Sequence, residues 1–234
     1  MIKRLENYEM PVELLQPWST FVMATELPPP ILERMIKITD EIVENKKSDS
    51  QDLNAGQVED QFFIDLEILE QEEVMEFFLN ICKNYVIRAQ CQSQPTNKKK
   101  ILQEKWLTEM NTIWINSQKD NEYFPIHYHT DCSLSAVMYL KIPEFLPSRK
   151  SYNNEEDGAI TFINNSSQDK IWLRPTLTIQ PKVGDFFIFP ASMQHQVFPF
   201  RTSDGKGERR SVSFNAVHSN KTVQDKLKKQ LDKI

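Results

Sequence analysis

The chain has 234 residues, of which 39% are hydrophobic and 26% are charged, and this composition predicts a single globular domain over residues 1–234. Its five glycines form neither G-x-G-x-x-G nor G-x-x-x-x-G-K-[ST], which excludes Rossmann and P-loop nucleotide enzymes. The formal net charge of −5 argues against a nucleic-acid partner, and no apolar run reaches the ~20 residues of a membrane helix, so no membrane partner is expected.

Residues 1–104 are predicted to be mainly helical and to support the rest of the chain. A first helix follows Pro28-Pro29-Pro30 and ends near Asn45, since one apolar face recurs at helical spacing: Ile31, Met35, Ile38 and Ile42. A second helix is predicted from about Gln71 to Gln90, on the apolar stripe Val74, Phe77, Phe78, Ile81 and Tyr85. Residues 91–100, which end in three lysines, are predicted as a solvated loop.

Residues 105–217 change to an apolar period of two, which is typical of strands. The segments predicted as strands are 110–116, 133–142, 159–163, 171–173, 185–189, 196–200 and 211–217. Helices followed by many short strands favour an α+β fold around one antiparallel sandwich or barrel. Residues 218–234 are predicted as a Lys-rich helix or tail.

The histidines suggest a metal site. His127, His129 and Asp131 are spaced by two, so an extended strand would project all three side chains to one face. Two imidazoles and a carboxylate suit Fe(II), Mn(II) or Zn(II). His195 opens a later strand and could close such a site across the sheet.

The last predicted strand carries a polar face inside an apolar core. By period two, Arg209, Ser211, Ser213 and Asn215 share one face, while Arg210, Val212 and Phe214 share the other. An arginine that projects into a barrel is costly unless it meets an anion, and its guanidinium fork matches a carboxylate. Each of these features alone also fits an ordinary surface or core role, but their order along successive strands favours one shared site.

In this arrangement the chain resembles the Fe(II)- and 2-oxoglutarate-dependent dioxygenases, and in particular the prolyl-hydroxylase-like 2OG-Fe(II) oxygenase group of bacteria and their viruses. The matching motifs are Trp114-Ile-Asn116, His127-Tyr-His129, Ser135-Ala-Val-Met-Tyr139-Leu, Gly184 to Pro190 with His195, Val197 and Pro199, and Arg209-Arg-Ser211-Val-Ser213-Phe-Asn215. The resemblance covers residues 105–217 well. It implies a double-stranded β-helix (jelly roll) as the catalytic core, with Ala136, Met138 and Ala191 as departures from the group's pattern.

The resemblance implies Fe(II), 2-oxoglutarate and O2 as cofactor and cosubstrates, with hydroxylation of a substrate and release of succinate and CO2. Two metal triads stay open: His127, His129 and His195 match the group position by position, while His129, Asp131 and His195 match the wider superfamily. The far carboxylate of 2-oxoglutarate would meet Arg209, with Ser211, Tyr139 or Asn116 assisting. No protein nucleophile or general base is required beyond the metal site.

Two other functions compete with this one. A cupin-like metalloenzyme would use the histidines without 2-oxoglutarate, and a non-catalytic jelly-roll binding protein would use neither. The resemblance favours a peptidyl or amino-acid side chain as substrate, with small molecules as the alternative, and the oligomeric state stays open, a homodimer included. The three cysteines lack C-x-x-C spacing and the N-terminus lacks an apolar signal segment, which together predict a cytoplasmic protein.

Overall fold

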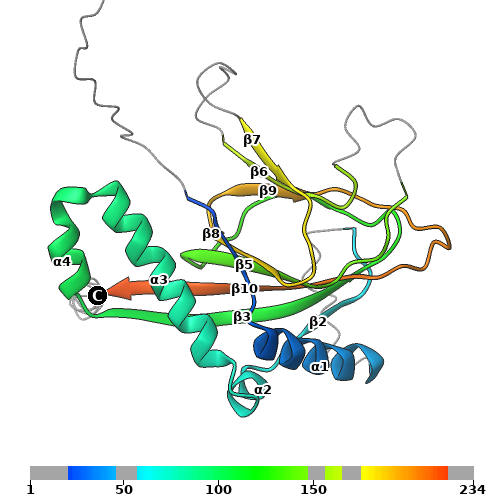
Figure 1. The fold of residues 1–234 in the computed structure, drawn as a ribbon, viewed down its shortest axis with the longest axis horizontal. Coiled ribbons are helices and arrows are strands. Elements are labelled where there is room, and N and C mark those ends of the chain that lie inside the picture. The colour runs from blue at the N-terminus through cyan, green and yellow to red at the C-terminus, as the bar shows by residue number, and fades with distance from the viewer. Residues whose placement is uncertain (1–20, 46–56, 147–155, 165–174, 221–234) are drawn as a thin grey trace, which may run out of the picture.

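A computed structural model describes residues 21–45, 57–146, 156–164 and 175–220. Two antiparallel sheets face each other, and the helices cover the outer side of the larger sheet (Figure 1). The major sheet has the order β1-β8-β5-β10-β3-β2, and the minor sheet has the order β4-β9-β6-β7. The predicted α+β class, with a double-stranded β-helix core and supporting helices, is confirmed.

The strands of the major sheet are β1 (Met23–Glu26), β2 (Gln61–Phe63), β3 (Trp106–Gln118), β5 (Leu134–Lys141), β8 (Asp185–Pro190) and β10 (Arg209–Asn220). The strands of the minor sheet are β4 (Phe124–His127), β6 (Ile160–Ile163), β7 (Thr176–Ile179) and β9 (Gln194–Val197). The helices are α1 (Pro29–Asn45), α2 (Leu66–Gln71), α3 (Met75–Ser93) and α4 (Lys98–Gln103).

A first core lies between the helices and the outer face of the major sheet. Met35, Ile38 and Ile42 of α1 are buried there, as the helical spacing predicted. From α3, the ring of Phe78 packs edge-on against Phe186, and its centroid lies 5.6 Å from that of Phe214. The helical and β regions therefore share one apolar core.

The second predicted helix starts later than expected. α3 begins at Met75 because Glu73 adopts a left-handed backbone (φ 56°), which separates α3 from the short helix α2. The predicted loop at 91–100 is wrong: α3 continues to Ser93, a 3₁₀ turn covers Pro95–Asn97, and α4 begins at Lys98. Ile101 is buried and packs α4 against the rest of the protein. This tertiary contact could not be predicted from the run of lysines.

A second core lies between the two sheets. Tyr139, Phe187 and Phe189 point inward from the major sheet and meet Ile160 and Phe162 of the minor sheet. On β10, the predicted division of faces is found: Val212 and Phe214 join the helix-facing core, while Ser211 and Ser213 line the space between the sheets. The strand period of two therefore decides which residues can reach an internal site.

The strand predictions differ from the structure in bounds and in number. β9 covers Gln194–Val197 instead of 196–200, because Pro199 has no N–H with which to continue the ladder. The exposed edge strand β7 was not predicted, since its sequence Thr-Leu-Thr-Ile has no buried face. The segment 171–173 lies outside the described residues, as does the tail after Asn220. None of the described helices is long and apolar enough to cross a membrane.

The connection between β9 and β10 crosses from the minor to the major sheet, so these two consecutive strands do not form a hairpin. Gly205 has a positive φ of 65°, and an added Cβ at Gly207 would lie 2.4 Å from Thr202 Cγ2. This crossing puts His195 and Arg209 on opposite sheets that enclose a common space.

Candidate metal centre

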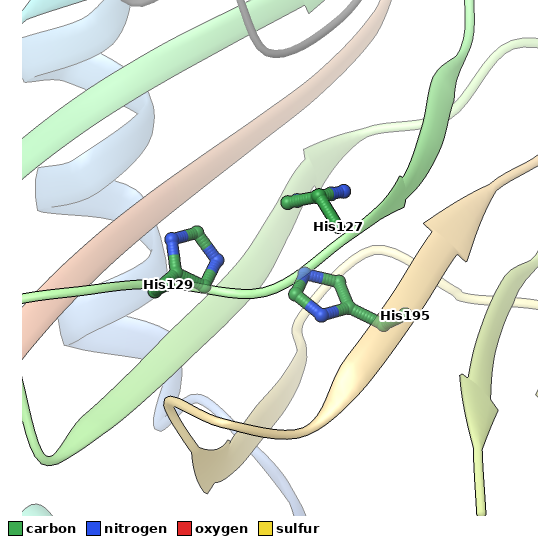
Figure 2. A group of neighbouring side chains, drawn as sticks. All are labelled: His127, His129 and His195. Carbon is green, nitrogen blue, oxygen red and sulfur yellow. The ribbon is translucent and has the colours of Figure 1, made fainter. Parts of the chain in front are cut away.

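Three histidines converge at one end of the minor sheet (Figure 2). β4 and β9 pair antiparallel with His127 opposite His195, and His129 follows two residues after the end of β4. The ring centroids of His127 and His195 lie 4.2 Å apart, and that of His129 lies 5.3 Å from His195. One nitrogen from each ring lies within 4.8 Å of the other two, an arrangement that can hold a metal ion.

Backbone carbonyls orient two of these rings. His127 Nδ1 lies 2.7 Å from the Pro125 carbonyl oxygen, and His195 Nδ1 lies 3.0 Å from that of Met193. A carbonyl can only accept, so each Nδ1 carries the proton and each Nε2 keeps its lone pair for a ligand. The backbone N–H of His129 donates to the Ala191 carbonyl at 2.9 Å, which ties the turn after β4 to the turn before β9.

Burial keeps the three imidazoles neutral. It lowers the pKa of His195 to about 3 and that of His129 to about 4, with a further lowering by the nearby His127. Burial also lowers the pKa of His127, although its hydrogen bond to the Pro125 carbonyl opposes the shift. At pH 7 all three rings are therefore neutral, the form that binds metal.

Asp131 does not join this group in the structure. Strand β4 ends at His127, and Asp131 adopts a left-handed backbone with φ 58°, so the alternation of an extended strand does not reach it. The residue is exposed, and its carbonyl oxygen accepts a hydrogen bond from Asn111 Nδ2. Among the described residues, the only group with metal-ligand geometry is His127, His129 and His195.

The three histidines line a cavity between the two sheets, and Arg209 lines the same cavity. Arg209 is 1% exposed, its NH1 donates to the Gly158 carbonyl, and its guanidinium carbon lies 5.3 Å from the centroid of the Tyr139 ring. Burial lowers the pKa of Arg209, and Tyr139 opposes the shift. Arg209 forms no ion pair with a carboxylate in the described part of the chain.

Two buried polar atoms at this cavity have no partner among the described residues: Arg209 Nε and the Tyr139 hydroxyl. Burial raises the pKa of the Tyr139 hydroxyl to about 12, so it stays protonated and able to donate. Buried donors without partners are rare in native proteins because each costs about 1–3 kcal/mol. A bound carboxylate would accept hydrogen bonds from both donors and would also compensate the charge of the guanidinium group.

The remaining predicted residues lie in the same cavity. Ser211 and Ser213 line it from β10, and Asn116 lines it from β3. Asn116 Oδ1 accepts from Gln61 Nε2 at 2.7 Å, and its Nδ2 donates to Ser213 Oγ at 3.3 Å. Asn116 is therefore already hydrogen-bonded at both ends of its amide, unlike Tyr139.

Two contributors to the site were missed in the sequence. Gly158 contacts Arg209 through its backbone carbonyl, so no side-chain pattern could indicate it. Gln61, on the short strand β2, donates a hydrogen bond that orients Asn116. The sequence offered only one sign of this role, a polar residue directly before two phenylalanines. Trp114 forms a wall of the cavity next to His129, with ring centroids 6.0 Å apart.

Residues 112–215 match the profile of a family described as "Putative 2OG-Fe(II) oxygenase". Among solved structures, the fold is similar to a prolyl hydroxylase from Trichoplax adhaerens in complex with a peptide fragment of the hypoxia inducible factor oxygen degradation domain (TM-score 0.52, 9% identity, covering 85% of this chain and 83% of that one). It is also similar to a 2OG-Fe(II) oxygenase family oxidoreductase from Burkholderia pseudomallei (TM-score 0.49, 13% identity, 83% and 84%) and to a Pseudomonas putida prolyl-4-hydroxylase (TM-score 0.46, 12% identity, 84% and 92%). No curated protein sequence matches the chain.

Proposed function

We propose that the chain is a 2OG-Fe(II) oxygenase, on the match of residues 112–215 to the profile of that family. In this proposal it holds Fe(II) with His127, His129 and His195 and binds 2-oxoglutarate with Arg209. The protein is a 2-oxoglutarate-dependent dioxygenase of the hydroxylase type. One observation carries the residue assignment: three neutral imidazoles line the same cavity as a buried arginine that meets no carboxylate in the described segments.

The three histidines fit an Fe(II) ion. One nitrogen of each ring lies within 4.8 Å of the other two, and imidazole suits iron. These three side chains would hold the ion at the cavity that Arg209 also lines. When bound, Fe(II) and 2-oxoglutarate supply the oxidising chemistry that hydroxylates the substrate and releases succinate and CO2. Asp131, which is exposed and lies outside this group, fits this role less well.

The cavity fits the far carboxylate of 2-oxoglutarate. Among the residues that the structure describes, neither Arg209 Nε nor the Tyr139 hydroxyl has a hydrogen-bond partner, and Ser211 lines the same cavity. A cupin-like enzyme that does not use 2-oxoglutarate would leave this cation buried without an anion, at a cost of several kcal/mol. The same cost argues against a binding protein that uses neither the metal nor the dicarboxylate.

The residues around the three histidines would orient these ligands and exclude water from a bound ion. The carbonyls of Pro125 and Met193 fix the ring orientation of two ligands, and the apolar rings of Trp114 and Phe189 wall the cavity. We further propose that residues 1–104 and 105–217 act as one domain, because α1 and α3 share a core with the strands that carry Arg209.

The proposed substrate is a peptidyl or amino-acid side chain. The T. adhaerens enzyme with a similar fold is described with a bound peptide fragment. In this chain the half-buried histidines adjoin the exposed side chains of Ile126 and Tyr128, which are 56% and 57% exposed. These two residues offer apolar and aromatic contacts beside the metal position, as a peptide ligand requires.

Anaerobic titration tests the assignment without knowledge of the substrate. Adding Fe(II) and then 2-oxoglutarate to the purified chain is expected to produce a metal-to-ligand charge-transfer absorption in the visible range. The absorption is expected to vanish in His195→Ala at any Fe(II) concentration used, and in Arg209→Met at 2-oxoglutarate concentrations that saturate the wild type. Absence of the absorption in the wild type would overturn the proposed function.

A further inference from the structure

Two consecutive arginines in β10 have opposite electrostatic surroundings. Arg209 points into the cavity and meets no carboxylate among the described residues, whereas Arg210 points to the helix side and contacts two. Both guanidinium groups are almost completely buried, at 1% and 3% residue exposure. Nothing in the proposed chemistry uses Arg210, so its buried charge pairs require another explanation.

Arg210 forms a charged network at the outer face of the major sheet. Its Nε and NH2 donate to the two carboxylate oxygens of Glu208 at 2.7 and 2.9 Å, and its NH1 donates to Asp40 Oδ1 on helix α1. Asp40 also accepts from Lys141 Nζ at the end of β5, and Glu208 accepts from Ser117 Oγ on β3 at 2.7 Å. The network therefore ties the start of β10 to both neighbouring strands and to α1.

The carboxylates in this network are ionised. Burial raises the pKa of Asp40, but hydrogen bonds from Lys141 and Arg210 outweigh that effect and hold the pKa below its ordinary value. For Glu208, burial again raises the pKa, and hydrogen bonds from Arg210 and Ser117 lower it further than burial raises it. Bidentate pairs of this kind fix direction as well as distance.

The strand geometry transmits that direction to Arg209. Arg210 lies opposite Ser117 on β3 and opposite Lys141 on β5, and the register with β5 shifts between Arg210 and Ser211. A register shift loosens the ladder at this point, so backbone pairing alone orients the strand less firmly here. Because neighbouring side chains in a strand point to opposite faces, a fixed Arg210 also fixes the direction of Arg209.

We propose that Arg210 is a positioning residue whose ion pairs with Glu208 and Asp40 aim the Arg209 guanidinium at the cosubstrate carboxylate. This inference rests on the proposed function. The network acts on 2-oxoglutarate affinity through Arg209 and leaves the metal ligands, which lie on the minor sheet and on the turn after β4, unaffected.

The test compares Asp40→Asn, Glu208→Gln and their combination with a control that breaks another ion pair of α1. The control variant, Glu72→Gln, removes the ion pair between Glu72 and Lys37 of α1. In this pair Lys37 Nζ lies 3.0 Å from Glu72 Oε1. Calorimetric titration of 2-oxoglutarate into Mn(II)-loaded protein measures Kd without turnover. We expect Kd to rise about 2- to 30-fold in the network variants, while the control and the Mn(II) affinity stay within about twofold of wild type.

A double-mutant cycle separates positioning from plain stabilisation. If Arg210 acts through Arg209, adding Asp40→Asn to Arg209→Lys is expected to raise Kd by less than Asp40→Asn does alone. Equal effects in both backgrounds, or an unchanged Kd in a double variant with a lowered Tm, would overturn the inference. If the Mn(II)-loaded wild type binds no 2-oxoglutarate, the proposed function fails as well, whereas wild-type binding with unaffected variants removes only the role of Arg210.

Discussion

Replacing Arg209 by methionine is expected to separate cosubstrate binding from folding. The change keeps an unbranched side chain of similar length and removes a charge that is 1% exposed and has no carboxylate partner among the described residues. A buried charge without compensation destabilises the folded protein, while the Gly158 carbonyl loses its donor at a cost of about 1–3 kcal/mol. These effects oppose each other, so we expect the free energy of unfolding without ligand to change by no more than about 1 kcal/mol.

The effect on 2-oxoglutarate binding is expected to be much larger. Leaving one partner of a buried charge pair alone costs about 3–5 kcal/mol, which corresponds to a rise in Kd of roughly two to three and a half orders of magnitude. Titration of 2-oxoglutarate into Mn(II)-loaded protein measures this change, and urea unfolding of the ligand-free variant measures stability. The Mn(II) affinity is expected to stay unchanged, because the three histidines come from other elements.

Two outcomes would contradict this reasoning. If the variant binds 2-oxoglutarate within about tenfold of wild type, Arg209 does not meet the cosubstrate carboxylate. If Mn(II) and 2-oxoglutarate affinities fall together while stability also falls, the substitution has disrupted the cavity as a whole, and the separate roles of the arginine and the histidines are wrong.

Three further predictions concern other parts of the chain. His195→Ala is expected to lose stoichiometric Fe(II) binding, measured by metal analysis after dialysis, and retention of one iron per chain would contradict the assigned ligands. Gly158→Ala is expected to weaken 2-oxoglutarate binding, because Gly158 has φ +70° and an added Cβ would lie 2.5 Å from Phe145 Cε2. The resulting shift of the backbone would displace the Gly158 carbonyl that accepts from Arg209. An unchanged affinity for 2-oxoglutarate in calorimetric titration would refute this. Burial raises the pKa of the Cys82 thiol from 9.0 to about 12, so the unfolded chain loses this proton at lower pH than the folded one, and stability is expected to fall as pH rises above about 9, less steeply in Cys82→Ala.

Local patterns predicted the elements whose form depends on near neighbours in the chain. The stripe Met35, Ile38 and Ile42 is buried in α1, and the inner face of β10 holds Arg209 and Ser211 as the strand period requires. These predictions succeed because the direction of a side chain in a helix or strand follows from backbone geometry over a few residues.

Predictions failed where a distant contact or one backbone angle decided the outcome. The left-handed Glu73 separates α2 from α3 within one apolar pattern, and the lysine run that suggested a loop is helical because Ile101 is buried. The face expected to be shared by His127, His129 and Asp131 does not include Asp131, since β4 stops at His127 and Asp131 has a left-handed backbone. Spacing alone contains no information on where a strand ends in space.

The amino-acid sequence by itself determined the chemical character of the site: neutral nitrogen ligands, a cation on an inward strand face, and no phosphate-binding loop. Only the tertiary structure decided which residues meet. Pairing of β4 with β9 puts His127 opposite His195, and the crossing from β9 to β10 places Arg209 across the same cavity, with the Gly158 carbonyl holding its guanidinium. The physical reason is that residue type and alternation are local properties of the chain, whereas strand pairing is selected by burial of the whole core.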